Sequence, residues 1–530
     1  MKANEEEKNT AAGKPSGLVD VDAFMEQVLA AYADGTASAA LPADEYAARG
    51  LIPAGTATLR DFSHIAPEIP EFIREKCTGC MDCVTECPDT AILAKVVPES
   101  RLEPELSKVS EGEHRDFLRN QFAETVKYHG MPKKKGKEPG QFGLFVDPTK
   151  CKGCAECVTV CGDKAALKMV AKTKPMMDER AKAFEFFGSL PDTPVEYIHE
   201  KVLADMMLAG RSLLYTGGGG SCMGCGEATA IRMMLAATGY VYGPDSAGIV
   251  AATGCNTVYG STYPYNPFMV PWTNSLFENI ATVAMGVRGR WNQTGREKKR
   301  LWAIGGDGAL LDIGFQALSR MLMSGMDINV LVLDTQVYSN TGGQTSTASF
   351  MSQEAKMSYF GKAQPGKTER RKEIGLLSLM HHPDVFVAQT TPAHVNHFYR
   401  AVMAANEYTG PSVVNVYTPC PPEHGIGDDA SVAQARLAVN THAFPLLIHD
   451  PRQGERLSDR LDLKGNPALK DDWYVNPKTK EPADFISFAR TEGRFAKHFN
   501  AKGEPSETLL KAQEERLANW RLLQELAGLR

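Results

Sequence analysis

The chain has 530 residues and a mass of 57.7 kDa, enough for about two to four domains with cores of their own. Hydrophobic residues make up 43% of it and charged residues 23%, which is typical of a globular protein. The net charge of −6 is spread along the sequence, so neither nucleic acid nor a membrane surface is expected as a partner.

The first 70 residues predict an arm rather than a domain. Helices are expected near 20–33 and 43–49, among Ala, Gly and Pro residues without a continuous core pattern. The opening segment, 1–17, is polar and lacks the apolar core of a signal peptide. No run of about eighteen apolar residues that would span a membrane is found. Together with the free thiols described next, these features predict a cytoplasmic protein.

Two cysteine runs of the same spacing follow, in a region expected to extend from about 71 to 180. Each run reads C-x2-C-x2-C-x3-C, and the first is followed by Pro88. In two-cluster ferredoxins the first three cysteines of a run bind one cubane and the fourth binds its neighbour. The sequence therefore predicts a ferredoxin-like α+β domain with two [4Fe-4S] clusters. The expected ligands are Cys77, Cys80, Cys83 and Cys161 for one cluster, and Cys151, Cys154, Cys157 and Cys87 for the other.

Zinc and disulfides are the alternatives to clusters. Zinc sites usually use two CxxC pairs, and disulfide frameworks belong to short secreted chains, so neither suits the doubled run. The remaining four of the twelve cysteines are Cys222, Cys225, Cys255 and Cys420. Their spacing alone is compatible with a third cluster, with zinc or with buried thiols. The basic segment 131–140, between the two runs, is expected to be a solvated connector rather than a docking patch.

From about residue 200 the sequence alternates between strands and helices. The expected strands are 248–254, 301–306, 328–334, 385–391 and 413–418, and the helices include 310–325 and 393–410. Buried strands that alternate with helices predict an α/β fold with a parallel sheet and helices on both faces. Ligands of such sheets bind at the carboxyl ends of the strands.

Two neighbouring strand ends carry polar residues. Asp307 lies in a GGDG turn after one strand, and an oxygen-rich turn with Thr335 and Asn340 follows the next. A carboxylate and other oxygens at this edge could hold Mg2+ together with a diphosphate. The glycines Gly306 and Gly308 let backbone N–H groups approach the phosphates. A GDG alone is usually only a turn, but the pairing with Asn340 matches the thiamin diphosphate motif.

The chain resembles the C-terminal half of pyruvate:ferredoxin oxidoreductase, a family of 2-oxoacid oxidoreductases with thiamin diphosphate and iron–sulfur clusters. The similarity runs from about residue 50 to the C-terminus. Besides the two cysteine runs, it is carried by SCMGCGE (221–227), ATGC (252–255), SLFEN (275–279), GGDGALLDIGFQAL (305–318), LDTQVYSNTGGQTS (333–346) and YTPC (417–420).

The resemblance implies that the third cysteine group also binds a [4Fe-4S] cluster, the one closest to thiamin. It further implies that Asp307, the Thr335 side chain and the Val337 carbonyl coordinate Mg2+, with Asn340 beside the cofactor. The remaining expected cofactor contacts are Gly254, Cys255, Gly306 and Gly308. Glu227 is a candidate catalytic residue near the diphosphate or the cluster, rather than the carboxylate that the thiamin aminopyrimidine requires.

The activity implied is coenzyme A-dependent oxidative decarboxylation of a 2-oxoacid, chiefly pyruvate, to acyl-CoA and CO2. Electrons would leave the thiamin one at a time, through a radical, and pass three clusters to ferredoxin or flavodoxin. 2-Oxoglutarate, oxalate and branched 2-oxoacids are alternative substrates. An electron-transfer subunit with a relic thiamin fold is the alternative function, although the retained Asp307, Thr335 and Asn340 favour catalysis.

Single-chain members of the family carry a pyrimidine-binding domain and a domain implicated in coenzyme A binding ahead of the ferredoxin-like domain. Only about 70 residues precede it here, so we expect partner subunits to supply both, in a dimer of heteromers, and the chain alone to be inactive. The expected domains are an arm (1–70), the two-cluster domain (71–180), the thiamin diphosphate domain (181–430) and a C-terminal extension (431–530) that packs on the core or a subunit interface. The extension is expected to end in a helix that starts at Ser506, with Leu510, Leu517, Trp520, Leu523 and Leu526 on one side.

Overall fold

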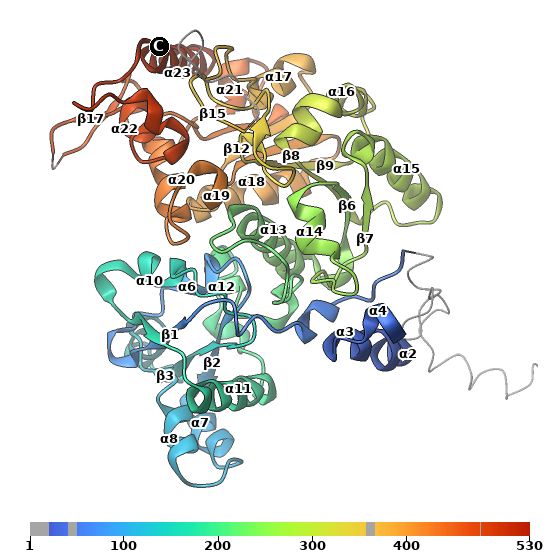
Figure 1. Cartoon of the computed structure of the whole chain (residues 1–530), viewed down its shortest axis with the longest axis vertical. Helices are drawn as coiled ribbons and strands as arrows, with labels where there is room; N and C mark the ends of the chain where they lie inside the picture. Colours follow the sequence, from blue (N-terminus) through green and yellow to red (C-terminus); the bar gives the residue numbers. More distant parts are fainter. Residues whose placement is uncertain (1–20, 41–49, 357–365, 478) are drawn as a thin grey trace, which may run out of the picture.

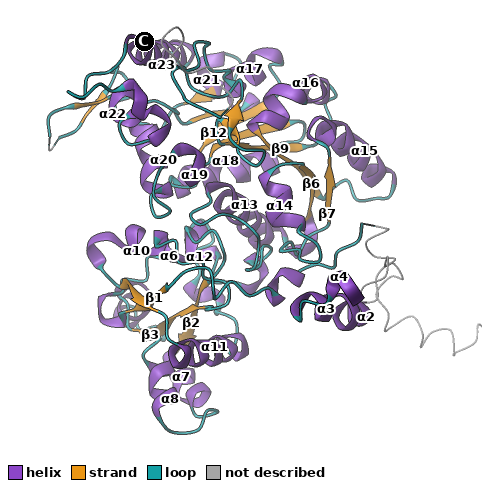
Figure 2. Cartoon of the chain, viewed as in Figure 1, coloured by secondary structure: helices purple, strands orange, loops and turns teal. Residues whose placement is uncertain are grey.

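Short runs of Val, Ile, Leu and Ala form a twisted eight-stranded sheet in the larger of two lobes (Figures 1 and 2). The computed structural model describes residues 21–40, 50–356, 366–477 and 479–530. The strands are β6 (Ala247–Ala252), β7 (Trp272–Ser275), β8 (Arg300–Gly306), β9 (Asn329–Asp334), β12 (Phe386–Thr390), β13 (Ser412–Tyr417), β14 (Leu447–His449) and β15 (Leu461–Asp462). Their order in the sheet is β15-β14-β12-β13-β9-β8-β6-β7, and the strands from β12 to β7 are parallel.

Both faces of this sheet are covered by helices, as the continuous apolar strands predict. Neighbouring residues of one strand, such as Leu331 and Val332 of β9, belong to different core clusters. Successive side chains of a strand point to opposite faces, so each face buries half of every strand. One face is covered by α13 (Gly226–Tyr242) and α18 (Val395–Glu407), and the other by α15 (Ile280–Gln293), α16 (Phe315–Leu322) and α17 (Ile374–His381). The predicted α/β architecture is confirmed.

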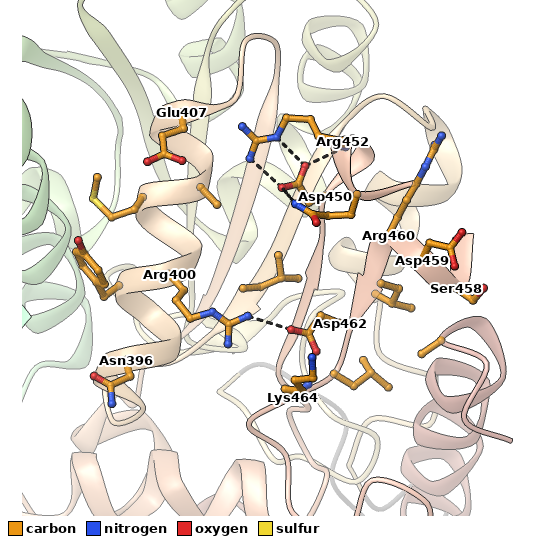
Figure 3. A pocket seen from close by; sticks show the side chains of 18 of the residues that line it. Asn396, Arg400, Glu407, Asp450, Arg452, Ser458, Asp459, Arg460, Asp462 and Lys464 are labelled. Carbon is orange, nitrogen blue, oxygen red and sulfur yellow. Dashed lines mark hydrogen bonds and ion pairs between the residues drawn. The ribbon is translucent and has the colours of Figure 1, made fainter. Parts of the chain in front are cut away.

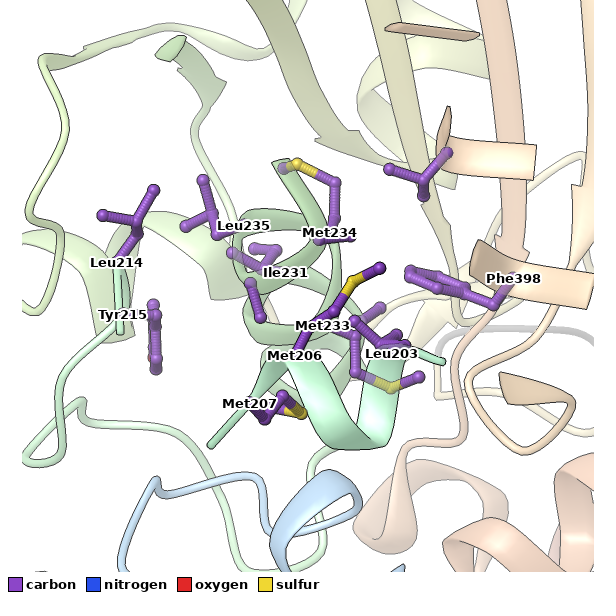
Figure 4. Packing of buried hydrophobic residues seen from close by; sticks show 14 of the residues in the cluster. Leu203, Met206, Met207, Leu214, Tyr215, Ile231, Met233, Met234, Leu235 and Phe398 are labelled. Atoms are coloured by element: carbon purple, nitrogen blue, oxygen red, sulfur yellow. The ribbon is translucent and has the colours of Figure 1, made fainter. Parts of the chain in front are cut away.

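Helix α13 lies between the sheet and the smaller lobe. All its residues from Gly226 to Tyr240 are buried, and a helix that is apolar on every side is stable only when it is enclosed. Figure 4 shows its side chains beside Phe398 of α18 and Met206 of α12 (Leu203–Met206). The same cluster of buried residues continues into the smaller lobe through Val84 and Phe142. The two lobes therefore share one hydrophobic core.

The smaller lobe contains both cysteine runs. Strands β1 (Glu68–Phe72) and β5 (Leu167–Ala171) pair antiparallel, and each run continues into a short helix, α6 (Asp82–Thr85) or α10 (Glu156–Cys161). The segment between the runs adds a second sheet of order β2-β4-β3. Its elements are β2 (Ile92–Pro98), α7 (Glu99–Leu106), α8 (Glu113–Arg119), β3 (Phe122–Ala123), α9 (Met131–Lys134) and β4 (Gly140–Val146), and α11 (Lys174–Ser189) packs on it. The basic residues around α9 are exposed.

The N-terminal arm has one of its two predicted helices within the described residues. The helical turns from Val21 to Ala33 bury Phe24 and Val28 against the loop that contains Tyr263. The other predicted helix, 43–49, lies outside the described residues. No helix in the described part of the chain is both long and apolar enough to cross a membrane.

The C-terminal extension packs on the chain's own core. It contributes β14 and β15 to the sheet edge, where both are antiparallel to their neighbours. It also forms helices α20 (Ser431–Asn440), α22 (Phe485–Ala489) and α23 (Glu507–Leu526). Ser506 caps α23 as expected, since its hydroxyl accepts from the Leu509 amide at 3.2 Å. The predicted apolar stripe was wrong at its start, because Leu510 is 44% exposed and Leu509 is buried instead.

Candidate functional site

Four strand ends bring the predicted site residues to one edge of the sheet. Gly254 follows β6, Asp307 follows β8, Thr335 follows β9 and Cys420 comes shortly after β13. These strands are neighbours in the order β13-β9-β8-β6, so their carboxyl ends meet. The pocket between them is lined by Glu227, Gly254, Cys255, Gly306, Gly308, Thr335, Val337, Ser339 and Asn340, among others. All the predicted catalytic and cofactor residues apart from Asp307 therefore line one pocket, and Asp307 is buried between the lining residues Gly306 and Gly308.

Asp307 is the centre of a buried cluster of oxygen atoms. Its Oδ1 accepts from the amide and from the hydroxyl of Thr335, both at 3.2 Å, and Thr335 Oγ1 lies 3.0 Å from the Val337 carbonyl oxygen. The Ser346 hydroxyl donates to the other carboxylate oxygen. Adjacent ligands of an octahedral Mg2+ with bonds of about 2.0–2.1 Å lie about 2.9 Å apart. The spacing and the chemistry of these oxygens fit such an ion.

Burial raises the pKa of Asp307 well above its usual value, and nearby Asp334 raises it further. A buried carboxylate is stabilised in its charged form by a neighbouring cation. For Asp334 that cation is Arg371, and both side chains of this ion pair are fully buried. Of these two carboxylates, Asp307 is therefore the one whose charged form a bound metal ion would stabilise most.

Gln336, between two of the predicted metal ligands, has a left-handed backbone with φ of 58°. This conformation is uncommon for a residue other than glycine, and it lets Thr335 Oγ1 and the Val337 carbonyl face each other. The Gln336 side chain is held at both ends, by Asp334 Oδ1 at 3.0 Å and by Arg494 Nη1 at 3.1 Å. Sequence reasoning missed Gln336 and Arg494, because nothing local marks either position.

Two glycines leave space at the pocket. Gly254 has φ of 145°, and a Cβ atom there would meet no atom within 4 Å, so its backbone is open to the pocket. A Cβ on Gly308 would lie 2.3 Å from the Tyr338 ring, so a larger residue would displace that ring. The pocket wall is therefore backbone rather than side chain at Gly254, as close approach of a diphosphate requires.

Glu227 lies on the pocket wall between the oxygen cluster and the third cysteine group. It is buried, and its Oε2 accepts from the Tyr259 hydroxyl at 3.1 Å. Burial raises its pKa to about 7, which the hydrogen bond from Tyr259 opposes. Asn340 is exposed at the pocket.

The twelve cysteines are free thiols that the fold brings into three groups. In each group, neighbouring thiols raise the pKa of at least one member, namely Cys83, Cys157 and Cys255, although burial is the larger cause at all three. The groups are Cys77, Cys80, Cys83 and Cys161; Cys87, Cys151, Cys154 and Cys157; and Cys222, Cys225, Cys255 and Cys420. The fourth cysteine of each run thus lies with the other run, in the sets expected from the sequence.

The cysteine groups are wider than a zinc site. A tetrahedral zinc with Zn–S bonds of about 2.3 Å holds its sulfurs about 3.8 Å apart. Within the described residues, the donor atoms of three metal-ligating side chains approach within 4.8 Å of one another only at Glu99, Glu124 and His129. In none of the three cysteine groups do three sulfurs approach one another this closely, so the groups fit an iron–sulfur cluster better than a single zinc ion.

Several hydrogen bonds are directed at the thiols. The Gly79 amide donates to Cys77 Sγ at 3.4 Å, and Lys164 Nζ lies 3.0 Å from Cys80 Sγ. Burial raises the pKa of Cys420 to about 12, while hydrogen bonds from the Glu423 amide and the Ser339 hydroxyl oppose this rise. N–H and O–H donors of this kind stabilise thiolates.

The polar groups between the second and third cysteine groups are buried and paired. Lys152 Nζ lies 2.6 Å from Asp89 Oδ1 and donates to the Ser221 carbonyl at 2.7 Å, directly before Cys222. From the other side, Arg232 of α13 donates to the Cys87 carbonyl at 3.2 Å. These contacts join the loops of two cysteine groups that lie in different lobes.

A second pocket, of about 940 Å³, lies away from these groups, between α18 and the β14–β15 edge (Figure 3). Arg400 pairs with Asp462 at 2.9 Å and Arg452 with Asp450 at 2.8 Å across its walls. These charges are satisfied within the chain, and we assign no ligand to this pocket.

Comparison with known families agrees with this description. Residues 252–416 match the family model "Thiamine pyrophosphate enzyme, C-terminal TPP binding domain", and residues 69–92 match a 4Fe-4S binding domain. The chain thus has a thiamin diphosphate-binding domain and a 4Fe-4S domain, as expected.

Relatives match over most of the chain. It is 31% identical to the probable pyruvate-flavodoxin oxidoreductase of Escherichia coli K12, over 84% of this chain and 41% of that protein. It is 32% identical to pyruvate synthase subunit PorB of Pyrococcus furiosus, over 58% of this chain and 92% of that subunit. A solved 2-oxoglutarate:ferredoxin oxidoreductase from Magnetococcus marinus is 22% identical, with a TM-score of 0.32 over 38% of this chain and 64% of that one. The chain spans less than half the length of the pyruvate-flavodoxin oxidoreductases it matches. It belongs to the pyruvate:ferredoxin oxidoreductase family, among the 2-oxoacid:ferredoxin oxidoreductases.

Proposed function

We propose that the chain is the thiamin- and cluster-bearing subunit of a coenzyme A-acylating 2-oxoacid:ferredoxin oxidoreductase, with pyruvate as substrate. The observation that carries the proposal is a single pocket lined both by Cys255, of the third cysteine group, and by the metal-site residues Thr335 and Val337. A decarboxylase needs only the metal–diphosphate site. A cluster at the same pocket would accept the electrons that the oxidation of the 2-oxoacid releases.

The metal–diphosphate site is proposed at the oxygen cluster. Asp307, the Thr335 hydroxyl and the Val337 carbonyl would hold Mg2+, and the open backbone at Gly254 would receive the diphosphate. Thiamin, when bound, supplies the electron sink that decarboxylation requires. Asn340 stands at the pocket where the cofactor would lie, and Glu227 acts from the wall near the diphosphate or the cluster.

We propose a [4Fe-4S] cluster at each of the three cysteine groups. The support is the doubled ferredoxin spacing, the exchange of the fourth cysteines and the width of the groups. The third group is the one at the thiamin pocket, and the other two lie in the smaller lobe. Electrons would leave there to ferredoxin or flavodoxin, the acceptors that the relatives' names carry.

Partner subunits are proposed to supply the pyrimidine-binding and coenzyme A-binding domains. The chain covers nearly all of a protein that is itself named a subunit, and less than half of the longer relatives. The complex is proposed to be a cytoplasmic dimer of heteromers. An electron-transfer subunit with a relic thiamin fold is disfavoured, because such a relic has no use for the oxygen cluster around Asp307.

The test is turnover by the complex purified anaerobically with its native partners. A panel of 2-oxoacids is assayed with coenzyme A for reduction of a low-potential dye, and pyruvate turnover that requires coenzyme A is expected. The Asp307→Asn variant should lose turnover and retain its iron, whereas Asp384→Asn, at an exposed position, serves as the control. An iron- and thiamin-replete complex that turns over no 2-oxoacid would contradict the catalytic proposal.

A further inference from the structure

We propose that Asn256 binds the magnesium–thiamin diphosphate complex, through a hydrogen bond that its side-chain oxygen accepts from a water molecule on the metal ion. The inference rests on the proposed function, which places that complex in the pocket at the strand ends. It assigns a role in cofactor binding to a residue outside the motifs that marked the site in the sequence.

Asn256 combines two properties that are seldom found together, contact with a pocket and nearly complete burial. It is the second residue of α14 (Cys255–Ser261), the helix that follows the open backbone of Gly254. It lines the same pocket as Thr335 and Val337, two of the proposed metal ligands. Only 2% of its surface is nevertheless exposed. The residue is therefore within reach of what the pocket binds, and it is largely shielded from bulk water.

The side-chain oxygen of Asn256 is unpaired. Oδ1 has no hydrogen-bond partner among the described residues. An amide oxygen has two lone pairs, and leaving both unpaired away from bulk water costs free energy. Most buried polar side-chain atoms are paired, so an exception calls for a water, an ion or a ligand as its partner.

Other polar side chains at the same site are paired within the chain. Glu227 Oε2 accepts from the Tyr259 hydroxyl at 3.1 Å, and Asp307 Oδ1 accepts from the Thr335 hydroxyl at 3.2 Å. The unpaired oxygen of Asn256 is thus not a general property of the pocket. It requires a hydrogen-bond donor that the bound group brings with it.

A hydrated metal ion provides such a donor. Mg2+ binds a near-octahedral set of oxygens, and it usually keeps water molecules beside carboxylates and substrate phosphates. Asp307, the Thr335 hydroxyl and the Val337 carbonyl would supply part of that set, and the diphosphate and water the rest. A water molecule on a dication is a strong donor. The ionised diphosphate oxygens only accept, so they cannot pair with Asn256 Oδ1.

The proposal predicts effects of opposite sign on stability and on binding. An unpaired buried oxygen destabilises the cofactor-free protein and strengthens binding once its donor arrives. Leucine has a similar size and no polar atom. Asn256→Leu should therefore leave the thermal midpoint of the cofactor-free complex unchanged or raise it, and weaken magnesium binding by about tenfold or more.

The experiment uses the complex purified anaerobically with its native partners and freed of metal and cofactor by a chelator. Magnesium is titrated at saturating thiamin diphosphate, binding is followed by protein fluorescence, and thermal midpoints are measured before loading. Asn256→Asp keeps an acceptor oxygen of the same size and should hold the magnesium affinity near the wild-type value. An asparagine that donated to the phosphates would instead become repulsive as a carboxylate.

The matched control is Asn466, which is also buried but fully paired. It is 7% exposed, its Oδ1 accepts from the Leu446 amide at 2.8 Å, and its Nδ2 donates to the Leu446 and Leu463 carbonyls at 2.7 Å. Asn466→Leu should lower the thermal midpoint and leave the magnesium affinity unchanged. The two leucine variants thus separate a binding asparagine from a structural one.

An unchanged magnesium affinity in Asn256→Leu would overturn the inference and leave the proposed function intact. Equal losses in Asn256→Asp and Asn256→Leu would overturn it too, because the side chain would then act as a donor. So would a thermal midpoint that falls as in Asn466→Leu.

Iron content provides a further readout, because Asn256 directly follows Cys255. It should stay at the wild-type value in Asn256→Leu, and a loss would assign the residue to the cluster loop and overturn the inference. A wild-type complex that binds no thiamin diphosphate in the presence of magnesium would instead contradict the proposed function, and the inference with it.

Discussion

Lys152, in the second cysteine run, and Asp89, directly after the first run, form a buried ion pair with Nζ and Oδ1 2.6 Å apart. Lys152 also donates to the Ser221 carbonyl at 2.7 Å, in the loop that leads to Cys222. Each side chain of the ion pair is only 4% exposed. A pair of this kind is strongly destabilising to break, because removal of one partner leaves the other charge buried and uncompensated.

We expect Lys152→Met to lower the free energy of unfolding by about 3–5 kcal/mol. It should also reduce the iron content, since the loop before Cys222 loses its anchor. Anaerobic denaturant unfolding and iron analysis provide the measurements. The double variant Lys152→Met with Asp89→Leu should recover part of the loss, because no unpaired charge remains.

The matched control for this pair lies in the same lobe. Lys168 and Glu71 also form an ion pair, at 2.7 Å, but their side chains are 56% and 42% exposed. Lys168→Met should therefore cost less than about 1 kcal/mol. Equal losses for Lys152→Met and Lys168→Met would contradict the importance of the buried pair.

Gly224 separates the cysteines of the CxxC pair and has φ of 68°, as does Gly325 in a distant turn. A Cβ atom on Gly224 would lie 2.1 Å from the Asp428 carbonyl oxygen, whereas on Gly325 it would meet nothing within 4 Å. Gly325→Ala should cost only the left-handed strain, about 1–2 kcal/mol. Gly224→Ala should cost more and lower the iron content, as unfolding and iron analysis would measure. Similar behaviour of the two variants would show that the close approach to Asp428 is unimportant.

Arg494 is expected to support the metal site from the C-terminal extension. Arg494 Nη1 donates to Gln336 Oε1, and the left-handed backbone of Gln336 positions Thr335 and Val337, the proposed metal ligands. Arg494→Lys keeps the charge beside Glu492 but loses the planar fork. Magnesium affinity should fall by about tenfold, measured by titration of thiamin diphosphate binding. The corresponding change at the exposed Arg490 is the control, and an unchanged affinity in Arg494→Lys would refute the role.

His397 of α18 is expected to make the protein sensitive to acid. Burial lowers its pKa from 6.5 to about 3, with nearby Arg400 as a smaller cause. Its Nε2 has no hydrogen-bond partner among the described residues, and Nδ1 lies 2.9 Å from the Thr390 hydroxyl. Between these pKa values the unfolded chain binds more protons than the folded one, so stability falls as the pH drops below about 6.5.

At pH 5 the penalty from His397 should be about 2 kcal/mol relative to pH 7. His397→Gln should remove that part of the loss, measured by anaerobic denaturant unfolding at the two pH values. His64, which is exposed, provides the matched substitution. The assignment fails if His397→Gln and the wild type lose the same stability on acidification.

Local patterns predicted the framework of the site. Apolar runs predicted the five strands β6, β8, β9, β12 and β13, because a strand buried on both faces is mostly apolar along its length. The spacing of the cysteines predicted which thiols lie together, and the predicted strand ends indicated where Asp307 and Thr335 lie. These features could be predicted from the sequence because each depends on residues that lie within a few positions of one another.

The features that escaped prediction depend on contacts between distant parts of the chain. Strands β14 and β15 are only a few residues long and acquire their strand geometry from their neighbours in the sheet, since β14 pairs with β12 and β15 pairs with β14. Arg494 reaches Gln336 from 158 residues away. The shift from Leu510 to Leu509 in α23 is an error of helix phase, which a single heptad-like pattern does not resolve.

The burial of α13 on every side has a consequence for how the molecule comes apart. Its residues pack in one continuous cluster with Val84 and Phe142 of the smaller lobe and with Ile249 and Trp302 of the sheet. An excised ferredoxin-like lobe would expose that shared surface to water and aggregate, and limited proteolysis should not release it intact. What looks in sequence like two separable domains should therefore melt as one unit, and the shared core should hold the proposed clusters of the two lobes at a fixed distance.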